Sequence, residues 1–289
     1  MRRIDPLNLL DDASSMSDPV PPNVHVVRPT ALRGDAAADG QPLCIEYSTT
    51  RVVPEAGRQL LNIPGVMSTE RSPLAETFKM LRNQVLLRLR AENHRLLAVT
   101  SPRAMAGKSL TALNLALAMA ADFDTAVMLV DGDLRGRRLQ QWFGLGDAPG
   151  LADHLTRGVA IPELLVNPGI ERFVFLPAGS SARADSAELL ATRAARQLIQ
   201  SMKQRYADRY IVVDLPPLLD SADAMAFLPQ VDTTLLVVED HGSSVADVEM
   251  AAEMLAPFAL LGTVMATRPE QEPDPLPWHR RLFGRRAVR

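Results

Sequence analysis

Short runs of apolar residues alternate with segments of helical periodicity through most of the chain. Continuous apolar runs are typical of strands that are buried on both faces, as in a parallel sheet. The helical segments between them fit the crossover connections that parallel strands require. The pattern therefore predicts an α/β fold with a mostly parallel, doubly wound sheet and helices on both faces. The predicted strands span residues 96–99, 126–130, 172–176, 210–213, 233–238 and 259–265.

A charged stripe accompanies the first predicted helix. Ser72 is a good N-cap, and the proline after it fits the first helical position. Apolar residues recur at helical spacing over residues 74–89 and form one face. Glu76, Lys79 and Arg82 lie three residues apart beside that face, either as a solvated surface or as a contact surface. The further predicted helices span residues 109–121, 139–143, 151–155, 187–206, 222–228 and 245–255.

The two ends of the chain differ from its middle. Residues 1–68 are rich in Pro, Asp, Ser and Ala without a sustained period, which predicts a mostly disordered arm. Residues 69–267 contain the predicted strands and helices and form one predicted domain. Residues 268–289 are rich in proline and then in arginine, so this tail either contacts anionic headgroups or a partner, or is simply solvated.

Composition narrows the function classes. The hydrophobic content of 47% is ample for a core, and the aromatic content of 4% makes that core aliphatic. The net charge of −3 gives no sign of nucleic-acid binding. The single cysteine, Cys44, excludes an intrachain disulfide, and the histidines lack metal-ligand spacing. Because we find no secretory signal and no apolar stretch long enough for a bilayer, we expect a cytoplasmic protein.

The stretch from Leu96 to Ala116 has the layout of a phosphate-binding loop: an apolar strand, a polar loop, Gly107-Lys108-Ser109 and a helix. Backbone N–H groups at the start of that helix would point at an anion. Lys108 would reach the β- and γ-phosphates of a nucleotide, and the Ser109 hydroxyl would bind Mg²⁺. Pro102 replaces a glycine of the general pattern, and the alternative is a plain turn with an exposed lysine. The residues predicted to surround the phosphates are Ala104, Met105, Ala106, Gly107, Lys108, Ser109 and Leu110.

Acidic residues follow two further apolar strands. Asp131 and Asp133 come after residues 126–130, and Asp214 ends the next long apolar run. Ligands of open α/β sheets bind at the carboxyl ends of the strands, so these groups and the phosphate loop are expected at one edge. Ser109 and Asp214 would hold Mg²⁺, Asp131 would be a general base or a metal ligand, and Asp133 would support it. Singly, each aspartate could be only a turn former or a helix cap. Arg135 could contact phosphate or pair with an aspartate.

Together these motifs resemble those of the bacterial tyrosine kinases (BY-kinases) of exopolysaccharide and capsule export, P-loop ATPases related to the partitioning ATPases. The family's Walker A motif is similar to residues 97–116, and its Walker B motif to residues 211–216. Three apolar residues followed by Asp-x-Asp-x-Arg, a motif specific to this family, match residues 128–135. The start of the first helix, residues 72–76, also fits.

The resemblance implies a P-loop NTPase fold that uses ATP and Mg²⁺ to phosphorylate tyrosine. It implies a membrane-spanning partner of the polysaccharide chain-length-determinant type, which completes the nucleotide site and holds the chain at the inner face of the membrane. It also implies a ring-like homo-oligomer built through a Glu-x-x-Arg-x-x-Arg stripe. That stripe corresponds to Glu76, Lys79 and Arg82, with lysine in place of the middle arginine.

Further departures from the family concern the site and the acceptor. Ala104-Met105 stand where relatives carry Pro-Gly or another small residue, and Ala266 stands where they often carry an asparagine near the base. The family's C-terminal tyrosine cluster is missing, because the chain's tyrosines are Tyr47, Tyr206 and Tyr210. The last two flank a predicted core strand and are expected to be structural. Phosphorylation is therefore expected on Tyr47 or on another protein, or does not occur.

Two alternatives to a kinase stay open. The protein could be a nucleotide-gated scaffold without kinase activity that regulates the export complex. It could also be a positioning ATPase of the partitioning type, although that branch carries an extra lysine early in the loop, for which Arg103 is a poor substitute.

Overall fold

The computed structural model describes residues 50–67, 72–104, 107–180, 185–206, 208–240 and 242–267. Within these ranges the strands form one sheet in the order β1-β4-β5-β3-β6-β2-β7-β8. All neighbouring pairs are parallel except β4 with β5, which confirms the predicted, mostly parallel sheet. The strands are β1 (Arg51–Val52), β2 (Leu96–Thr100), β3 (Ala126–Asp131), β4 (Val166–Asn167), β5 (Phe173–Leu176), β6 (Arg209–Asp214), β7 (Thr233–Glu239) and β8 (Leu260–Ala266).

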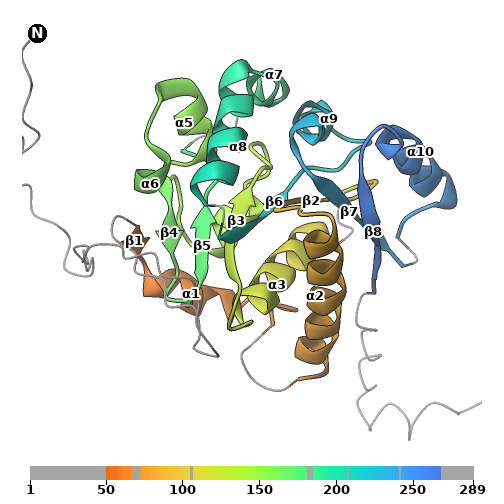
Figure 1. Ribbon diagram of the computed structural model, residues 1–289, viewed down its shortest axis with the longest axis horizontal. Coiled ribbons are helices and arrows are strands. Elements are labelled where there is room, and N and C mark those ends of the chain that lie inside the picture. Colours follow the sequence, from red (N-terminus) through yellow and green to blue (C-terminus); the bar gives the residue numbers. More distant parts are fainter. Residues whose placement is uncertain are drawn as a thin grey trace, which may run out of the picture.

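Helices cover both faces of the sheet, as predicted (Figure 1). Helices α1 to α4 contribute to the apolar cluster on one face, and α5 to α10 contribute to the cluster on the other. Among the helices described, none is both long enough and apolar enough to cross a bilayer. The helices are α1 (Pro54–Leu60), α2 (Pro73–Ala91), α3 (Lys108–Ala120), α4 (Arg138–Trp142), α5 (Leu151–Arg157), α6 (Ile161–Leu164), α7 (Ser186–Leu190), α8 (Arg193–Arg205), α9 (Ala222–Phe227) and α10 (Val245–Leu255).

The middle of each central strand is apolar without interruption because it faces a core on both sides. In β2, Leu96 and Ala98 belong to one cluster, and Leu97 and Val99 to the other. Successive side chains of a strand point to opposite faces, so a strand that lies between two helical layers needs apolar residues at every position. The phosphate loop thus leaves the sheet from a fully buried strand.

The structure differs from the predicted elements most clearly at two places. Residues 51–60 were expected in the disordered arm, yet they form β1 and α1, where Ala56 and Leu60 are buried in the core. The helix predicted over residues 187–206 is broken into α7 and α8, because the Thr192 hydroxyl accepts the Ala195 N–H at 3.1 Å and begins a new helix. Residues 1–49 and 268–289 lie outside the described residues, and the division into arm, domain and tail stays a prediction.

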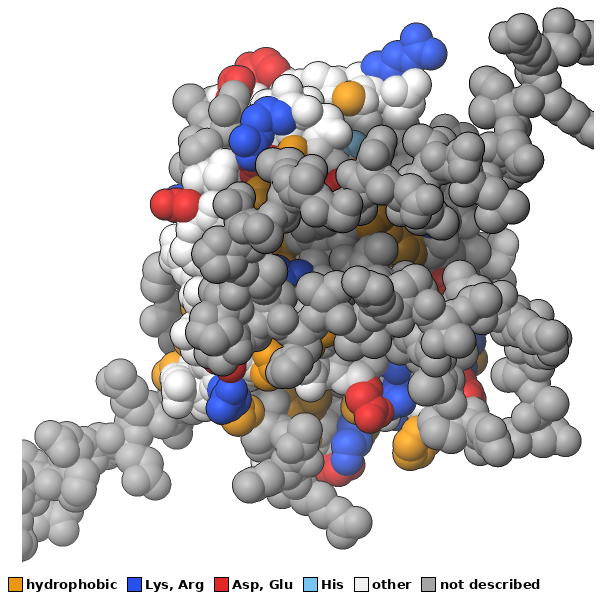
Figure 2. Space-filling model, turned by 90° about the vertical axis from the view of Figure 1, so that its left-hand side faces the viewer, with side chains coloured by type: hydrophobic (Ala, Val, Ile, Leu, Met, Phe, Trp, Pro, Cys, Tyr) orange, Lys and Arg blue, Asp and Glu red, His pale blue; other side chains and the backbone are white. Residues whose placement is uncertain are grey.

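The surface on the β1 side carries mixed charge. Figure 2 shows basic, acidic and hydrophobic side chains intermixed on the described part of this side. Neither sign of charge dominates among the described side chains that this view leaves uncovered.

Candidate nucleotide-binding site

Three strand ends meet at the carboxyl edge of the sheet. Strands β3, β6 and β2 are neighbours in that order, and Asp131 at the end of β3 is paired in register with Asp214 at the end of β6. The phosphate loop leaves β2 beside them, since Val99 is paired with Asp214. The structure therefore brings together the three segments that contain the predicted motifs.

The N-terminus of α3 is left open to an anion. Gly107, the residue before α3, has φ of 71°, a left-handed conformation that favours glycine, and no side chain caps the helix. A Cβ atom at this position would lie 3.2 Å from the Cβ of Ala266. Uncapped N–H groups at a helix start suit a phosphate. Leu110 lies half-buried in the first turn of α3, whereas Met105 and Ala106 lie outside the described residues.

Lys108 and Asp214 form a buried ion pair. The Lys108 Nζ lies 2.5 Å from Asp214 Oδ1 and 3.2 Å from the Ser109 hydroxyl. Lys108 is 7% exposed and Asp214 is fully buried, so burial raises the pKa of the Asp214 carboxyl while the ammonium opposes that shift. Asp214 Oδ2 is buried without a hydrogen-bond partner. An unpartnered carboxylate oxygen beside a hydroxyl fits the water shell of a Mg²⁺ ion.

Asp131 is a buried carboxyl with a strongly raised pKa. Its Oδ2 accepts the backbone N–H of Gln140 at 3.0 Å, and its Oδ1 accepts that of Asp133 at 3.3 Å. Burial is the main cause that raises its pKa to about 8, and repulsion from Asp214 adds to it. A carboxyl whose pKa lies this close to neutrality can both take up and release a proton, which suits acid–base chemistry.

Asp133 and Arg135 hold the segment that follows β3. Asp133 Oδ1 accepts the Gly136 N–H at 2.8 Å, so this aspartate forms a turn. Arg135 donates to the Ser186 hydroxyl at 2.7 Å and to Asp223 Oδ1 at 3.3 Å. Of the two predicted roles for Arg135, the structure therefore shows the pairing with an aspartate.

The first half of the phosphate loop is held by carboxylates that the sequence analysis missed. Arg103 pairs with Asp220 and Asp247, each at 3.0 Å. Asp220 Oδ2 also accepts the backbone N–H of Ala104 at 2.8 Å. These partners are more than a hundred residues apart in the chain, so no local pattern marks them.

The predicted contact stripe on α2 is partly engaged within the chain. Glu76 pairs with Lys79 at 2.7 Å, and Arg82 donates to the backbone oxygen of Ala118 at 3.3 Å. Among the described tyrosines, Tyr210 is buried in β6 as expected, and Tyr206 is half-buried at the end of α8. Tyr47 lies outside the described residues.

The sheet order and the loop between β2 and α3 define a P-loop nucleotide-binding fold. Among solved structures, the chimerical protein CapA2B2 matches with a TM-score of 0.64 and 24% identity, over 75% of this chain and 92% of that one. This likeness supports the fold alone.

Sequence comparison leads to one group of relatives, although no family model matches the chain. It is 33% identical over 176 residues to the succinoglycan biosynthesis transport protein ExoP of Rhizobium meliloti, a match that covers 60% of this chain and 22% of that protein. It is 28% identical over 182 residues to the tyrosine-protein kinase CpsD of Streptococcus agalactiae, covering 62% and 76%. These matches confirm the resemblance to bacterial tyrosine kinases of capsule and exopolysaccharide biosynthesis. The chain spans only 22% to 25% of the length of the first curated relatives.

Proposed function

We propose that the chain is an ATP-dependent, P-loop tyrosine-kinase-like enzyme of exopolysaccharide or capsule biosynthesis. The observation that carries the proposal is the meeting of Lys108 from α3 with Asp214, beside Asp131, at the ends of adjacent parallel strands. The lysine, hydroxyl and carboxylates that phosphoryl transfer needs are thus contributed by three neighbouring segments.

Each group has a proposed role. Lys108 stabilises the charge of the transferring phosphoryl group, and its ammonium leaves Asp214 for the phosphates when a nucleotide binds. Ser109 and Asp214 hold Mg²⁺, whose role when bound is to neutralise phosphate charge. Asp131 takes the proton of the attacking hydroxyl or binds the metal, and Asp133 keeps its segment in position. The backbone from Ala104 to Leu110 surrounds the phosphates.

The acceptor is a tyrosine in trans. Tyr210 lies within the core and is not accessible, and Tyr206 is half-buried beside Arg209. A phosphoacceptor needs a free hydroxyl that can reach the γ-phosphate in line. We therefore propose Tyr47 of another copy, or a tyrosine of another protein, as the acceptor.

We also propose two partners, one from a named relative and one from the charged residues of α2. A relative named as a transport protein for succinoglycan biosynthesis supports action beside a membrane-spanning protein of the chain-length-determinant type, at the inner face of the membrane. Glu76, Lys79 and Arg82 on α2 are the proposed contacts of a homo-oligomer. A scaffold without kinase activity is not favoured, because relatives are named as tyrosine kinases.

A phosphotransfer assay tests the proposal. The purified chain is incubated with ATP and a tyrosine-containing copolymer, in Mg²⁺ or in EDTA, and phosphotyrosine is measured. We expect Mg²⁺-dependent product that falls at least about a hundredfold in Lys108→Met. Arg90→Met, an exposed change on α2, is the control and should match the wild type. Equal product from wild type and Lys108→Met would contradict the proposed role of the loop.

A further inference from the structure

The buried carboxyl Asp131 receives its shorter hydrogen bond from a residue outside the three motifs. Gln140 donates its backbone N–H to Asp131 Oδ2 at 3.0 Å, compared with 3.3 Å for the bond from Asp133 to Oδ1. Gln140 lies in α4, a helix of only five residues. So short a helix is not stable by itself, and other contacts must hold this N–H group in place.

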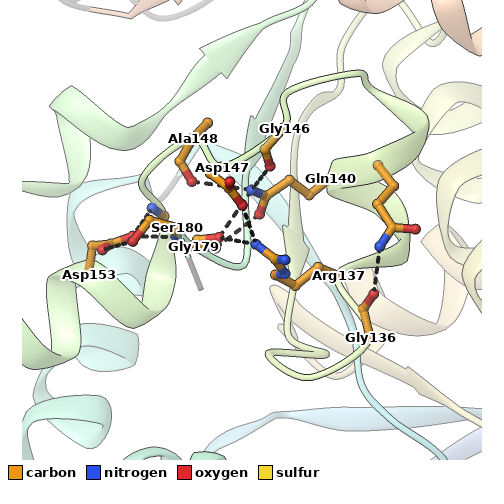
Figure 3. A network of polar contacts seen from close by, with 11 residues as sticks. Gly136, Arg137, Gln140, Gly146, Asp147, Ala148, Asp153, Gly179 and Ser180 are labelled. Carbon is orange, nitrogen blue, oxygen red and sulfur yellow. Dashed lines mark hydrogen bonds and ion pairs between the residues drawn. The ribbon is translucent and has the colours of Figure 1, made fainter. Parts of the chain in front are cut away.

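The side chain of Gln140 provides those contacts. It is fully buried, and its Nε2 donates to the backbone oxygens of Gly146 at 2.8 Å, Ala148 at 3.2 Å and Gly179 at 3.1 Å. Its Oε1 accepts the N–H of Gly179 at 3.0 Å. Figure 3 shows the amide between the turn after α4 and the loop after β5. One side chain thus ties α4 to two other segments.

Residues 177–180, which follow β5, are themselves firmly held. Ser180 donates its backbone N–H and its hydroxyl to the two oxygens of Asp153, at 3.0 Å and 2.8 Å (Figure 3). Arg137 donates to the backbone oxygen of Gly179 at 3.3 Å. A Cβ atom on Gly150 would lie 2.1 Å from the backbone oxygen of Pro177, so the two backbones are in close contact. Gln140 is therefore anchored to a fixed part of the fold.

We propose that Gln140 is a positioning residue for Asp131, which acts by holding the α4 N–H group against the buried carboxylate. This inference rests on the proposed function, in which Asp131 belongs to the site that uses Mg²⁺. Without the Gln140 amide, α4 loses its ties to Gly146, Ala148 and Gly179, and the orientation of Asp131 Oδ2 is no longer fixed. Groups that orient a metal-site carboxylate commonly change metal affinity or activity by about 10- to 100-fold.

The test measures ADP affinity of the full chain by calorimetry, in Mg²⁺ and in EDTA. In the wild type, ADP should bind more tightly in Mg²⁺ than in EDTA. We expect Gln140→Leu to reduce this ratio of affinities by at least about tenfold, with the affinity in EDTA unchanged. Gln141→Leu is the matched control, because Gln141 is exposed and its side-chain amide donates to the backbone oxygen of Gly136 at 3.3 Å. Gln141→Leu should keep the full effect of Mg²⁺ on ADP affinity. If Gln140→Leu does not fold, Gln140→Met retains the length of the side chain while removing both the donor and the acceptor.

A double-mutant cycle separates positioning from a merely structural role. If Gln140 acts through Asp131, adding Gln140→Leu to Asp131→Asn should cause no further loss of the Mg²⁺ effect. Additive losses, or an equal loss of affinity in EDTA, would overturn the proposal while leaving the proposed function intact. A wild type whose ADP affinity does not respond to Mg²⁺ would contradict the proposed metal site, and the role of Gln140 with it.

Discussion

Replacing Lys108 by methionine should destabilise the protein by an amount that depends on pH. The ammonium lies 2.5 Å from Asp214 Oδ1, and the other oxygen has no partner, so Lys108→Met leaves a buried carboxylate without a counter-charge. Breaking a buried ion pair from one side costs about 3–5 kcal/mol. The carboxyl can instead take up a proton, which costs about 1.4 kcal/mol for each pH unit above its ordinary pKa.

The magnitude follows from that ordinary pKa of 3.8. At pH 8 protonation would cost about 6 kcal/mol, so the loss is set by the broken pair at about 3–5 kcal/mol. At pH 5.5 protonation costs only about 2 kcal/mol and limits the loss to that value. Folding raises the pKa of the Asp214 carboxyl. The variant is therefore most stable below pH 3.8 and loses stability as the pH rises.

The assay is urea unfolding of the chain without nucleotide at both pH values. The matched control is Lys79→Met, which breaks an ion pair of similar length, 2.7 Å, whose side chains are 43% and 60% exposed. An exposed pair contributes less than about 1 kcal/mol, with little change between pH 5.5 and 8. Equal losses of unfolding free energy in the two variants at pH 8 would show that Lys108 does not compensate a buried charge.

Two further predictions concern the same edge of the sheet. Asp131→Asn should gain stability relative to the wild type as pH rises from about 4 to 8, because the wild-type carboxyl has a pKa raised to about 8; urea unfolding across that range measures this, and a constant difference would contradict it. Gly107→Ala should lower the free energy of unfolding by about 1–2 kcal/mol, since φ there is 71°. The matched comparison is Gly158→Ala, which has the same φ of 71° with no atom within 4 Å of its Cβ and should show a similar loss; an unchanged unfolding midpoint for Gly107→Ala would be contrary to expectation.

The sequence was enough to predict which segments meet, because each motif follows a predicted parallel strand. Apolar runs that end in Gly107-Lys108-Ser109, Asp131 and Asp214 had to be parallel strands, and parallel strands present their carboxyl ends at one edge. Right-handed crossovers set the face on which each connecting helix lies, whereas the order of the strands is defined only by the completed fold. The site was therefore predictable at the level of strand ends.

The contacts within the site were not predictable from local pattern. Arg103 meets Asp220 and Asp247 across 117 and 144 residues of sequence, so only the completed fold defines these pairs. Gln140 is a polar residue in a short helix, and nothing in its neighbourhood indicates that it is fully buried. Its burial depends on the loop after β5, which packs against it.

We propose that Mg²⁺-nucleotide binds where α3 faces the ends of β3 and β6, and the shift in thermal unfolding on adding the nucleotide measures this binding. At a hundred times its Kd, Mg²⁺-ADP should stabilise the wild type by about 2.7 kcal/mol, or roughly 5–10 °C for a domain of this size. We expect that Lys108→Ala, measured under the same conditions, loses this shift. An equal shift in both proteins, or no shift in the wild type, would contradict the claim.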